Sequence, residues 1–338
     1  MQRNKSILVI RLSAIGDVAM SVHAVKALRK AYPDYRITVC TRERLAGFFN
    51  GIPDLDFMFF PAKANFIDLL RFIGQARKKK FGYVADIQNN LRTGIMRFFL
   101  KLSGCKVAAY NQMTIEKWRV KRRFKKHLQP LRNNVLRFCD VFAKLGFPVE
   151  EPVVEKKKLP LPEAFDCPKN GNWIGIAPFS RKDKKIYPLN MMAEVVGMLS
   201  QKAEKVFIFS GPGKEKQYAD SLSAKYPNVI PVFGKTDFCG ETALISNLDI
   251  LITMDSATMH MASLTGANFL CIWGGTHPAT GYSAWGANWK ENYIQINLPC
   301  RPCSNYGEGR CRYKDYRCLS IIDPVYIVYK TLSNINHE

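Results

Sequence analysis

The sequence alternates short apolar runs with segments of helical spacing, and this alternation limits the possible folds more than any other feature. A short apolar run bounded by turn residues predicts a buried strand, whereas apolar residues at every third or fourth position predict a helix. In the first half of the chain, strands are predicted at 6–10, 36–40, 56–60, 83–87 and 105–110. Helices are predicted at 17–31, 64–79, 92–102 and 132–145. Such alternation predicts a mostly parallel sheet covered by helices.

The same pattern begins again in the second half. Strands are predicted at 173–177, 205–210, 229–233, 249–253 and 268–273. Helices are predicted at 188–202, 213–226, 241–247, 257–265 and 323–334. The last helix has a clear start, because Asp323 is a good N-cap and Pro324 suits the first helical position. The chain therefore contains two α/β units of similar size.

A break separates the two blocks. Residues 146–172 are rich in proline and charge and show no periodicity. We predict an N-terminal Rossmann-like domain at 1–155, a linker at 156–172 and a second Rossmann-like domain at 173–322. The remaining segment, 323–338, is predicted as a helix that could pack back on the N-terminal domain.

Basic residues are concentrated in the first half. The net charge is +22, and residues 1–158 hold 32 Lys and Arg against 12 Asp and Glu, whereas residues 159–338 hold 18 against 16. This asymmetry predicts an anionic partner for the N-terminal half, namely nucleic acid, an anionic membrane surface or a phosphorylated glycolipid. A solvated basic face that only aids solubility is the alternative.

Targeting signals are not evident. The N-terminal apolar run, residues 7–10, is too short for a signal peptide, and no apolar run reaches the length of about 18 residues that a membrane span needs. We therefore expect a cytosolic protein without a membrane span.

The loop after the first strand, in "SILVIRLSAIGDVAMSVHAVKALRKAYP", departs from a dinucleotide site. Such a site needs three glycines around a phosphate, but this loop has only Gly16, followed by Asp17. A carboxylate here would repel a phosphate. It suits a general base that takes a proton from a hydroxyl, and the local pattern fits a plain helix cap equally well.

The segment "LDILITMDSATMHMASLTGA" is the sharpest candidate site of the second half. Its strand ends at Thr253, Asp255 and Ser256 open a helix, and His260 follows one turn later. The free amides and positive dipole end of a helix start form an anion site at the carboxyl end of a strand. A simple Asp cap and a surface histidine would explain each residue alone, but together they favour a binding site.

Two further loops follow strands of the same domain. In "APFSRKDKKIYP", Ser180 and Lys185 can donate to phosphate oxygens, although the spacing is not that of a P-loop. In "SGPGKEKQ", the glycines allow close backbone approach and Glu215 can accept from ribose hydroxyls. Both loops are expected at the sheet edge where ligands of open α/β sheets bind.

These motifs together resemble the heptosyltransferases of lipopolysaccharide core assembly, glycosyltransferase family 9. The resemblance is carried, in order, by "RLSAIGDV", "FSRKDKKIYP", "GPGKE", "MDSATMHMA" and "WGGTHPATGYSAWG". It implies the GT-B fold, in which two Rossmann-like domains with parallel sheets face a central cleft. It also implies transfer of heptose from ADP-heptose, with inversion at the anomeric carbon and without an essential metal or other cofactor.

The resemblance also implies roles for individual residues. Asp17 would be the catalytic base that deprotonates the acceptor hydroxyl. The donor would be bound by residues of the second domain, with Ser180 and Lys185 at the diphosphate, Glu215 at the ribose, Thr236 at the adenine, and Asp255, Ser256, Ala257 and His260 at the heptose and phosphates.

The basic segments fit an acceptor made of acidic sugars on a phosphorylated lipid. The segment 117–132 holds eight Lys and Arg and no acid, and Arg77–Lys80 adds four more. We expect Arg11, Lys121, Arg122 and Arg123 to contact such an acceptor at the cytoplasmic face of the inner membrane. A nucleic-acid groove is the weaker interpretation, because it leaves Asp17 and the loops of the second domain unexplained.

Four of the ten cysteines lie close together in the sequence, at Cys300, Cys303, Cys311 and Cys318. Disulfides are not expected in the cytosol, so we interpret them as free thiols, with a structural zinc site as the alternative. We expect no catalytic metal.

Three functions remain to be distinguished. The first is an inverting heptosyltransferase that acts as a monomer on ADP-heptose and an anionic lipid-linked oligosaccharide. The second keeps the GT-B fold with another nucleotide sugar or acceptor, and the third is a basic nucleic-acid-binding protein without activity.

Overall fold

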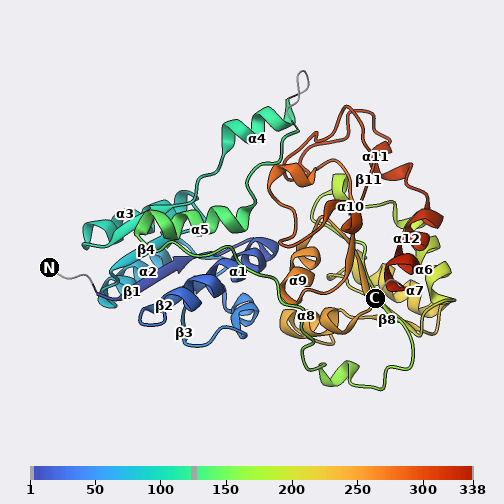
Figure 1. The fold of residues 1–338 in the computed structure, drawn as a ribbon, viewed down its shortest axis with the longest axis horizontal. Coiled ribbons are helices and arrows are strands. Elements are labelled where there is room, and N and C mark those ends of the chain that lie inside the picture. The colour runs from blue at the N-terminus through green and yellow to red at the C-terminus, as the bar shows by residue number, and fades with distance from the viewer. Residues whose placement is uncertain (1–3, 123–127, 337–338) are drawn as a thin grey trace. The chain divides into compact units, whose positions relative to one another are not determined.

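The computed structural model describes residues 4–122 and 128–336 and divides the chain into two compact units. The first unit contains residues 1–113 and 132–153, and the second contains residues 114–131 and 154–338 (Figure 1). Each unit is built on its own parallel sheet. The domain limits expected from the sequence stay a prediction, and the structure adds that 114–131 clusters with the second unit.

The sheet of the first unit has five parallel strands in the order β3-β2-β1-β4-β5. The strands are β1 (Ser6–Ile10), β2 (Arg36–Thr41), β3 (Leu55–Phe59), β4 (Tyr83–Asp86) and β5 (Lys106–Ala109). The order reverses at β1, which pairs with both β2 and β4. Ligands of open α/β sheets bind beyond the carboxyl ends of the strands at such a reversal.

Helices cover both faces of this sheet. They are α1 (Ile15–Ala31), the 3-10 helix η1 (Glu43–Phe49), α2 (Phe66–Lys78), α3 (Leu91–Leu102) and α5 (Asn134–Leu145). Helix α1 packs against α5, and α2 packs against α3. Side chains of α2 and α3, including Leu69, Phe72 and Leu100, form one core cluster with Leu8 and Ile10 of β1. The strand β1 is fully apolar from Ile7 because helices cover it on both faces.

The sheet of the second unit has six parallel strands in the order β11-β10-β9-β6-β7-β8. The strands are β6 (Trp173–Ala177), β7 (Lys205–Ile208), β8 (Val229–Pro231), β9 (Ile250–Met254), β10 (Phe269–Trp273) and β11 (Tyr293–Gln295). Here the order reverses between β9 and β6, which are paired in register from Ile174–Ile250 to Ala177–Thr253. The loops after these two strands therefore begin side by side.

Helices and short helical turns accompany this sheet. The helices are α4 (Thr114–Lys121), α6 (Leu189–Ser200), α7 (Lys214–Lys225), α8 (Phe238–Asn247), α9 (Ala257–Thr265), α10 (Trp289–Asn292), α11 (Arg317–Ser320) and α12 (Pro324–Asn336). The 3-10 turns are η2 (Glu163–Phe165), η3 (Asp183–Lys185) and η4 (Pro278–Thr280). Helix α4 contacts η4. The sequence patterns did not indicate α4 or these short elements.

The C-terminal helix α12 packs within the second unit. It lies against α6 and β9, and Ile327 is fully buried in the core cluster that also contains Val195 and Ile252. Partly buried Leu332 and Ile335 extend this contact. One apolar face of α12 is thus packed within its own unit, and the expected packing on the N-terminal domain stays a prediction.

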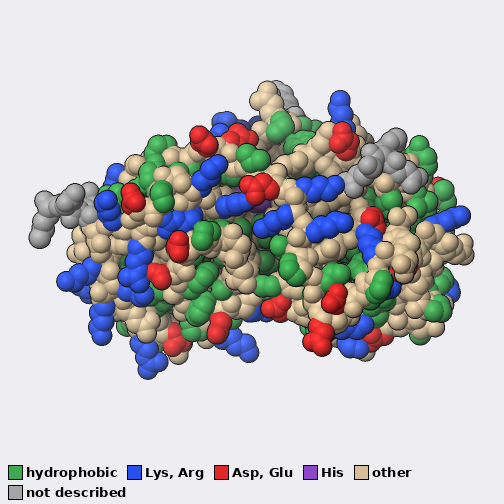
Figure 2. Space-filling model, turned by 60° about the horizontal axis from the view of Figure 1, so that its bottom comes forward, with side chains coloured by type: hydrophobic (Ala, Val, Ile, Leu, Met, Phe, Trp, Pro, Cys, Tyr) green, Lys and Arg blue, Asp and Glu red, His purple; other side chains and the backbone are tan. Residues whose placement is uncertain are grey.

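The positive charge is shared between the two units. The first unit holds 22 Lys and Arg against 10 Asp and Glu, and the second holds 28 against 18. The imbalance between sequence halves becomes smaller because the basic segment 114–131 clusters with the second unit. On the face shown in Figure 2, Lys and Arg side chains (blue) are spread among acidic and apolar ones. In the described part of the chain, we find no helix with both the length and the apolar character that a membrane span requires.

Candidate active site

Asp17 lies in the first turn of α1, directly beyond the carboxyl end of β1. Its Oδ2 is 2.8 Å from Nη2 of Arg11 and accepts a hydrogen bond from the backbone N–H of Ala14 at 3.2 Å. The side chain keeps a quarter of its surface exposed. Asp17 therefore caps the helix start and also presents a carboxylate to solvent, so the two roles that the sequence left open are compatible.

Arg11 is buried, although we expected it at the acceptor. Its Nη1 donates to the carbonyl oxygen of Ile87 at 2.6 Å, and its guanidinium lies 5.2 Å from the centre of the Phe138 ring. Only 5% of the residue is exposed. The guanidinium is thus held between a carbonyl, an aromatic ring and Asp17, which makes it an anchor for that carboxylate and leaves it little surface for an acceptor.

The loop after β4 supports the Asp17 loop. The side-chain oxygen of Gln88 accepts from the backbone N–H groups of Leu12 at 3.0 Å and Ser13 at 3.2 Å. Sequence reasoning did not identify this glutamine. The sequence does contain a pattern that indicates Gln88, because polar residues follow a buried strand in "VADIQNN". This strand, β4, is the neighbour of β1 in the sheet.

Asp86, at the end of β4, is completely buried. It accepts from the backbone N–H groups of Gln88 at 3.1 Å and Asn89 at 2.8 Å, and its Oδ2 lies 2.6 Å from Nη1 of Arg97. Burial raises the pKa of this carboxyl above its ordinary value, although the hydrogen bonds and the charge of Arg97 act in the opposite direction. Asp86 thus fixes the turn that carries Gln88.

In the second unit, Lys185 and Asp255 form the centre of the candidate donor site. Nζ of Lys185 lies 2.8 Å from Oδ2 of Asp255 and donates to the carbonyl oxygen of the same residue at 3.2 Å. Oγ of Ser180 donates to that carbonyl at 3.1 Å. The loop after β6 is therefore joined to the end of β9, as expected for neighbouring parallel strands.

The start of α9 lies beside this ion pair. Ser256 is the N-cap, and its hydroxyl is within hydrogen-bond distance of the hydroxyls of Thr253 (3.3 Å) and Thr258 (2.8 Å). Ala257 is the first residue of the helix, and His260 is buried one turn later. Four backbone N–H groups at a helix start lack partners within the helix, so this end is a site for an anion next to a lysine.

A third segment, the loop Gly274–Thr276 after β10, completes the cluster; it lies in the "WGGTHPATGYSAWG" motif, although no site role was predicted for its residues. Oγ1 of Thr276 donates to Oδ2 of Asp255 at 2.7 Å. The backbone N–H of Gly275 donates to the carbonyl oxygen of Lys184 at 2.7 Å, and a Cβ on Gly274 would lie 2.3 Å from that oxygen. The glycine is needed because the two backbones approach so closely.

Arg301 fixes the loop Gly274–Thr276 through hydrogen bonds to its backbone carbonyl oxygens. It is 3% exposed and donates to the carbonyl oxygens of Gly274, Ile296 and Thr276, the last at 3.0 Å. Burial lowers the pKa of its guanidinium to about 10. The C-terminal segment therefore supports the donor site through Arg301 and Thr276.

Glu215 and Thr236 lie at the same edge of the sheet, each held by its own loop. Glu215 is in the first turn of α7, and its Oε2 accepts from the backbone N–H of Gly211 at 2.7 Å. Thr236 follows β8 and packs so closely on Gly240 that a Cβ there would lie 1.7 Å from its Oγ1. Nearby Glu241 has its pKa raised to about 7, by burial first and by the charge of Asp237 second. No role was predicted for Glu241 from the sequence.

The basic residues expected at the acceptor lie on and after α4. Lys121 and Arg122 are exposed, and the guanidinium of Arg122 lies 5.1 Å from the centre of the Trp118 ring. Arg123 lies outside the described residues. Lys117 anchors the helix, because its Nζ is 2.9 Å from the hydroxyl of Tyr282 and 3.1 Å from that of Tyr306.

The four C-terminal cysteines are free thiols. Cys303 is exposed, whereas Cys318 is buried and its pKa is raised to about 11, mainly by desolvation. Across residues 4–122 and 128–336, no group of three or more His, Cys, Asp or Glu side chains could hold a metal ion. The four cysteines are therefore not gathered into one ligand set in this structure, and the zinc alternative stays a prediction.

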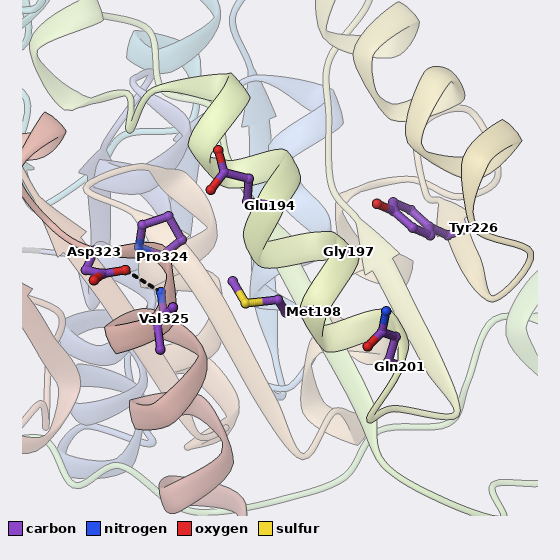
Figure 3. A pocket seen from close by; sticks show the side chains of 8 residues that line it. All are labelled: Glu194, Gly197, Met198, Gln201, Tyr226, Asp323, Pro324 and Val325. Atoms are coloured by element: carbon purple, nitrogen blue, oxygen red, sulfur yellow. Dashed lines mark hydrogen bonds between the residues drawn. The ribbon is translucent and has the colours of Figure 1, made fainter.

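A shallow pocket elsewhere in the second unit is distinct from these residues. It lies between α6 and the start of α12 and is lined by residues that include Glu194, Met198 and Asp323 (Figure 3). The carboxylate of Asp323 accepts from the backbone N–H of Val325 at 2.8 Å and so caps α12. None of the expected site residues lines this pocket, and its acidic groups do not suit a phosphate.

Comparisons with known proteins agree with this architecture. The chain is 25% identical over 286 residues to the lipopolysaccharide core heptosyltransferase OpsX of Haemophilus influenzae, covering 81% of this chain and 80% of that protein. It is 24% identical over 298 residues to lipopolysaccharide heptosyltransferase 1 of Campylobacter coli, covering 80% and 84%.

Solved structures share the fold at lower identity. A glycosyl transferase family 9 protein from Veillonella parvula has a TM-score of 0.75 at 18% identity, and the match covers 100% of this chain and 99% of that chain. The E. coli heptosyltransferase WaaC, solved with ADP, has a TM-score of 0.70 at 16% identity, with 97% of this chain and 99% of that chain covered.

Two α/β units on separate parallel sheets, with polar loops beyond the strand ends, have the GT-B fold that these structures share. The family model for glycosyltransferase family 9 (heptosyltransferase) matches residues 69–316. The chain belongs to this family, and it is an enzyme that transfers a glycosyl group.

Proposed function

We propose that the protein transfers heptose from ADP-heptose to a hydroxyl of an anionic, lipid-linked core oligosaccharide in lipopolysaccharide core biosynthesis. The cluster of Lys185, Asp255 and the start of α9 carries this proposal, since it offers a lysine and a helix dipole to a diphosphate at the sheet edge. The named activities of the relatives from Haemophilus influenzae and Campylobacter coli support the same substrate class.

The second unit holds the donor. Lys185 and Ser180 bind the diphosphate, and Ser256 and Ala257 present the backbone N–H groups of the helix start to it. Glu215 accepts from the ribose, Thr236 lies by the adenine, and Asp255 and His260 position the heptose. Lysine and helix-start donors stabilise the charge that develops on the leaving ADP, so no cofactor is assigned to that step.

Asp17 acts on the acceptor. Its carboxylate takes the proton of the acceptor hydroxyl while that oxygen attacks the anomeric carbon of the heptose. The new glycosidic bond forms as the bond from the anomeric carbon to the β-phosphate oxygen breaks, and ADP leaves with the electron pair. Attack from the face opposite the leaving group inverts the configuration.

The exposed Lys121 and Arg122, together with Arg123, bind the acidic groups of the acceptor. We further propose that the enzyme works as a monomer at the cytoplasmic face of the inner membrane. The net charge of +22 supports this location, because a basic residue near an anionic leaflet contributes about 1 kcal/mol.

Replacement of Asp17 tests the proposal most directly. Asp17→Asn should lower turnover at least 1,000-fold while calorimetry still detects ADP-heptose, because the donor is held by the other unit. A fully active Asp17→Asn enzyme would rule out the base. A preference for a UDP-sugar in a thermal-shift screen would instead indicate another donor, and salt-sensitive binding of oligonucleotides without any response to nucleotide sugars would indicate a nucleic-acid-binding protein.

A further inference from the structure

Two neighbouring helices of the first unit expose apolar side chains away from the core. On α3, Leu91, Phe98 and Leu102 lie on one side of the helix at helical spacing, whereas Ile95 between them is partly buried and packs against the core cluster. Leu91, Phe98 and Leu102 are 85%, 59% and 69% exposed. The opposite side of the same helix is buried in the core at Met96 and Leu100. The helix is therefore apolar on two faces, and three large side chains of its outer face stay exposed.

Helix α2 continues this surface. It packs beside α3, buries Leu69 and Phe72, and exposes Phe66, Ile67 and Leu70 by 63%, 57% and 44%. We name the surface formed by these six exposed side chains the α2–α3 face, that is Phe66, Ile67, Leu70, Leu91, Phe98 and Leu102. Large apolar side chains exposed on neighbouring helices usually mark a contact site for another protein or a membrane.

Basic residues lie at the ends of the helices that form the α2–α3 face. Residues 61–106 hold ten Lys and Arg but only two Asp, and one of these, Asp86, is buried and paired with Arg97. Exposed cations lie at the end of α2 and near the end of α3, at Arg77, Lys78, Lys79, Lys80 and Lys101. The remaining acid, Asp68, lies at the start of α2 near Arg71.

Exposed apolar side chains together with nearby cations indicate which kind of partner binds the α2–α3 face. An apolar helix face with a basic rim is the surface that lies in the interface of an anionic bilayer, with the apolar side chains among the acyl chains and the cations at the headgroups. A second copy of this chain fits less well, because it would bring two rims of like charge together.

We propose that the α2–α3 face docks the enzyme on an anionic lipid bilayer. This inference rests on the proposed function, in which the acceptor is anchored in a membrane, and it specifies which surface makes the contact. Helices α2 and α3 contact the membrane, and the positive charges of Lys78, Lys79 and Lys101 favour anionic lipid.

Vesicle co-sedimentation of the full chain tests the proposal. The wild type should bind vesicles of phosphatidylethanolamine and phosphatidylglycerol at least ten times more tightly than vesicles of phosphatidylcholine. The variant Leu91→Ser, Phe98→Ser, Leu102→Ser should lose at least ten-fold in affinity for the anionic vesicles. As a matched control, Val325→Ser, Tyr326→Ser, Tyr329→Ser removes three exposed apolar side chains from α12 and should bind like the wild type.

A charge variant keeps the test decisive if the first variant folds poorly. Lys78→Glu, Lys79→Glu, Lys101→Glu should weaken binding to anionic vesicles by a similar factor. Reversal of the exposed Lys202, Lys225 and Lys290 on the second unit is its control and should have a much smaller effect. Equal melting temperatures establish that the variants are folded.

Three results would overturn the proposal. The first is unchanged vesicle binding by folded variants of the α2–α3 face, and the second is equal or absent binding of the wild type to both vesicle types. The third is a wild-type dimer that becomes a monomer in the variant Leu91→Ser, Phe98→Ser, Leu102→Ser, which we call the α3 variant. Transfer to a deacylated, water-soluble acceptor separates this proposal from the proposed function. That reaction should be unaffected in the α3 variant, and its absence in the wild type would contradict the function while leaving the vesicle result valid.

Discussion

Nζ of Lys185 and Oδ2 of Asp255 lie 2.8 Å apart, although 70 residues separate them in the chain. Both side chains are largely buried, with 16% and 6% of their surfaces exposed. The lysine follows β6 and the aspartate follows β9, and these strands are neighbours at the point where the strand order reverses. The ion pair thus links the two loops of the second unit that the proposed donor needs.

Loss of the lysine should affect both donor binding and stability. Lys185→Met removes the cation proposed for the diphosphate and leaves Asp255 without its charged partner. We expect ADP to bind at least 30-fold more weakly by calorimetry, and the free energy of unfolding to fall by about 1–3 kcal/mol in urea. Arg181→Met removes an exposed cation from the same loop and is the control. Equal ADP affinity of the two variants would contradict the role of Lys185.

Arg11 should act through Asp17 and not through the donor. Arg11→Gln removes the ion pair of 2.8 Å and the hydrogen bond to Ile87, so the carboxylate loses the group that holds it. Under the proposed function, we expect kcat to fall 10- to 100-fold while the Kd for ADP changes less than two-fold. Arg11→Lys keeps the positive charge but cannot contact the Ile87 carbonyl and Asp17 together as the guanidinium does. Its kcat should therefore lie between those of Arg11→Gln and the wild type.

The exposed Arg44 provides a control for the loss of one positive charge from the same unit. Arg44→Gln should leave kcat close to that of the wild type. If Arg11→Gln raised the KM for the acceptor and left kcat unchanged, Arg11 would be an acceptor ligand, as expected from the sequence, and not a positioning residue.

Thr276 should contribute to the donor site through a single hydroxyl. Thr276→Val keeps the shape of the side chain but removes the donor to Asp255, so a carboxylate oxygen loses a hydrogen bond of 2.7 Å. We expect the free energy of unfolding to fall by about 1–2 kcal/mol and the KM for the nucleotide sugar to rise 3- to 10-fold. Thr276→Ser keeps the hydroxyl and should stay near wild type in KM. Equal effects of the two changes would show that the methyl group matters and not the hydrogen bond.

The sequence predicted the two parallel sheets and the residues that directly follow their strands. Strands such as β1 and β9 are apolar throughout because helices cover both faces, and this makes them visible as short runs. Asp17, Lys185 and Asp255 could be found because polar residues after such strands lie at one edge of the sheet. Their position follows from the local pattern and the topology alone.

Residues whose role depends on distant packing could not be found in this way. Thr276 and Arg301 act on Asp255 through a loop and a C-terminal segment that no local pattern connects. Arg11 was expected to contact the acceptor, whereas its guanidinium is buried between the carbonyl of Ile87 and the ring of Phe138, which lie far away in the sequence. Helix α4 was not predicted, and its buried Lys117 is held by the hydroxyls of two tyrosines far along the chain, which no local pattern indicates.

Glu241 makes stability depend on pH in a predictable direction. Its pKa in the folded protein is raised to about 7 from 4.5, by burial and by Asp237. Below pH 4.5 the carboxyl is protonated in both the folded and the unfolded chain, and above pH 7 it is ionised in both. The folded state is therefore favoured at low pH, and this contribution is lost as the pH rises from about 4.5 to about 7.

Removal of the charge isolates this effect. Glu241→Gln should raise the free energy of unfolding at pH 8 by about 1–3 kcal/mol relative to the wild type, and by much less at pH 5, in urea titrations at both values. Glu163→Gln, at an exposed position on η2, controls for the loss of one negative charge. An equal effect of Glu241→Gln at pH 5 and pH 8 would mean that the carboxyl of Glu241 does not titrate between them, and the pH dependence would then have to arise from other groups.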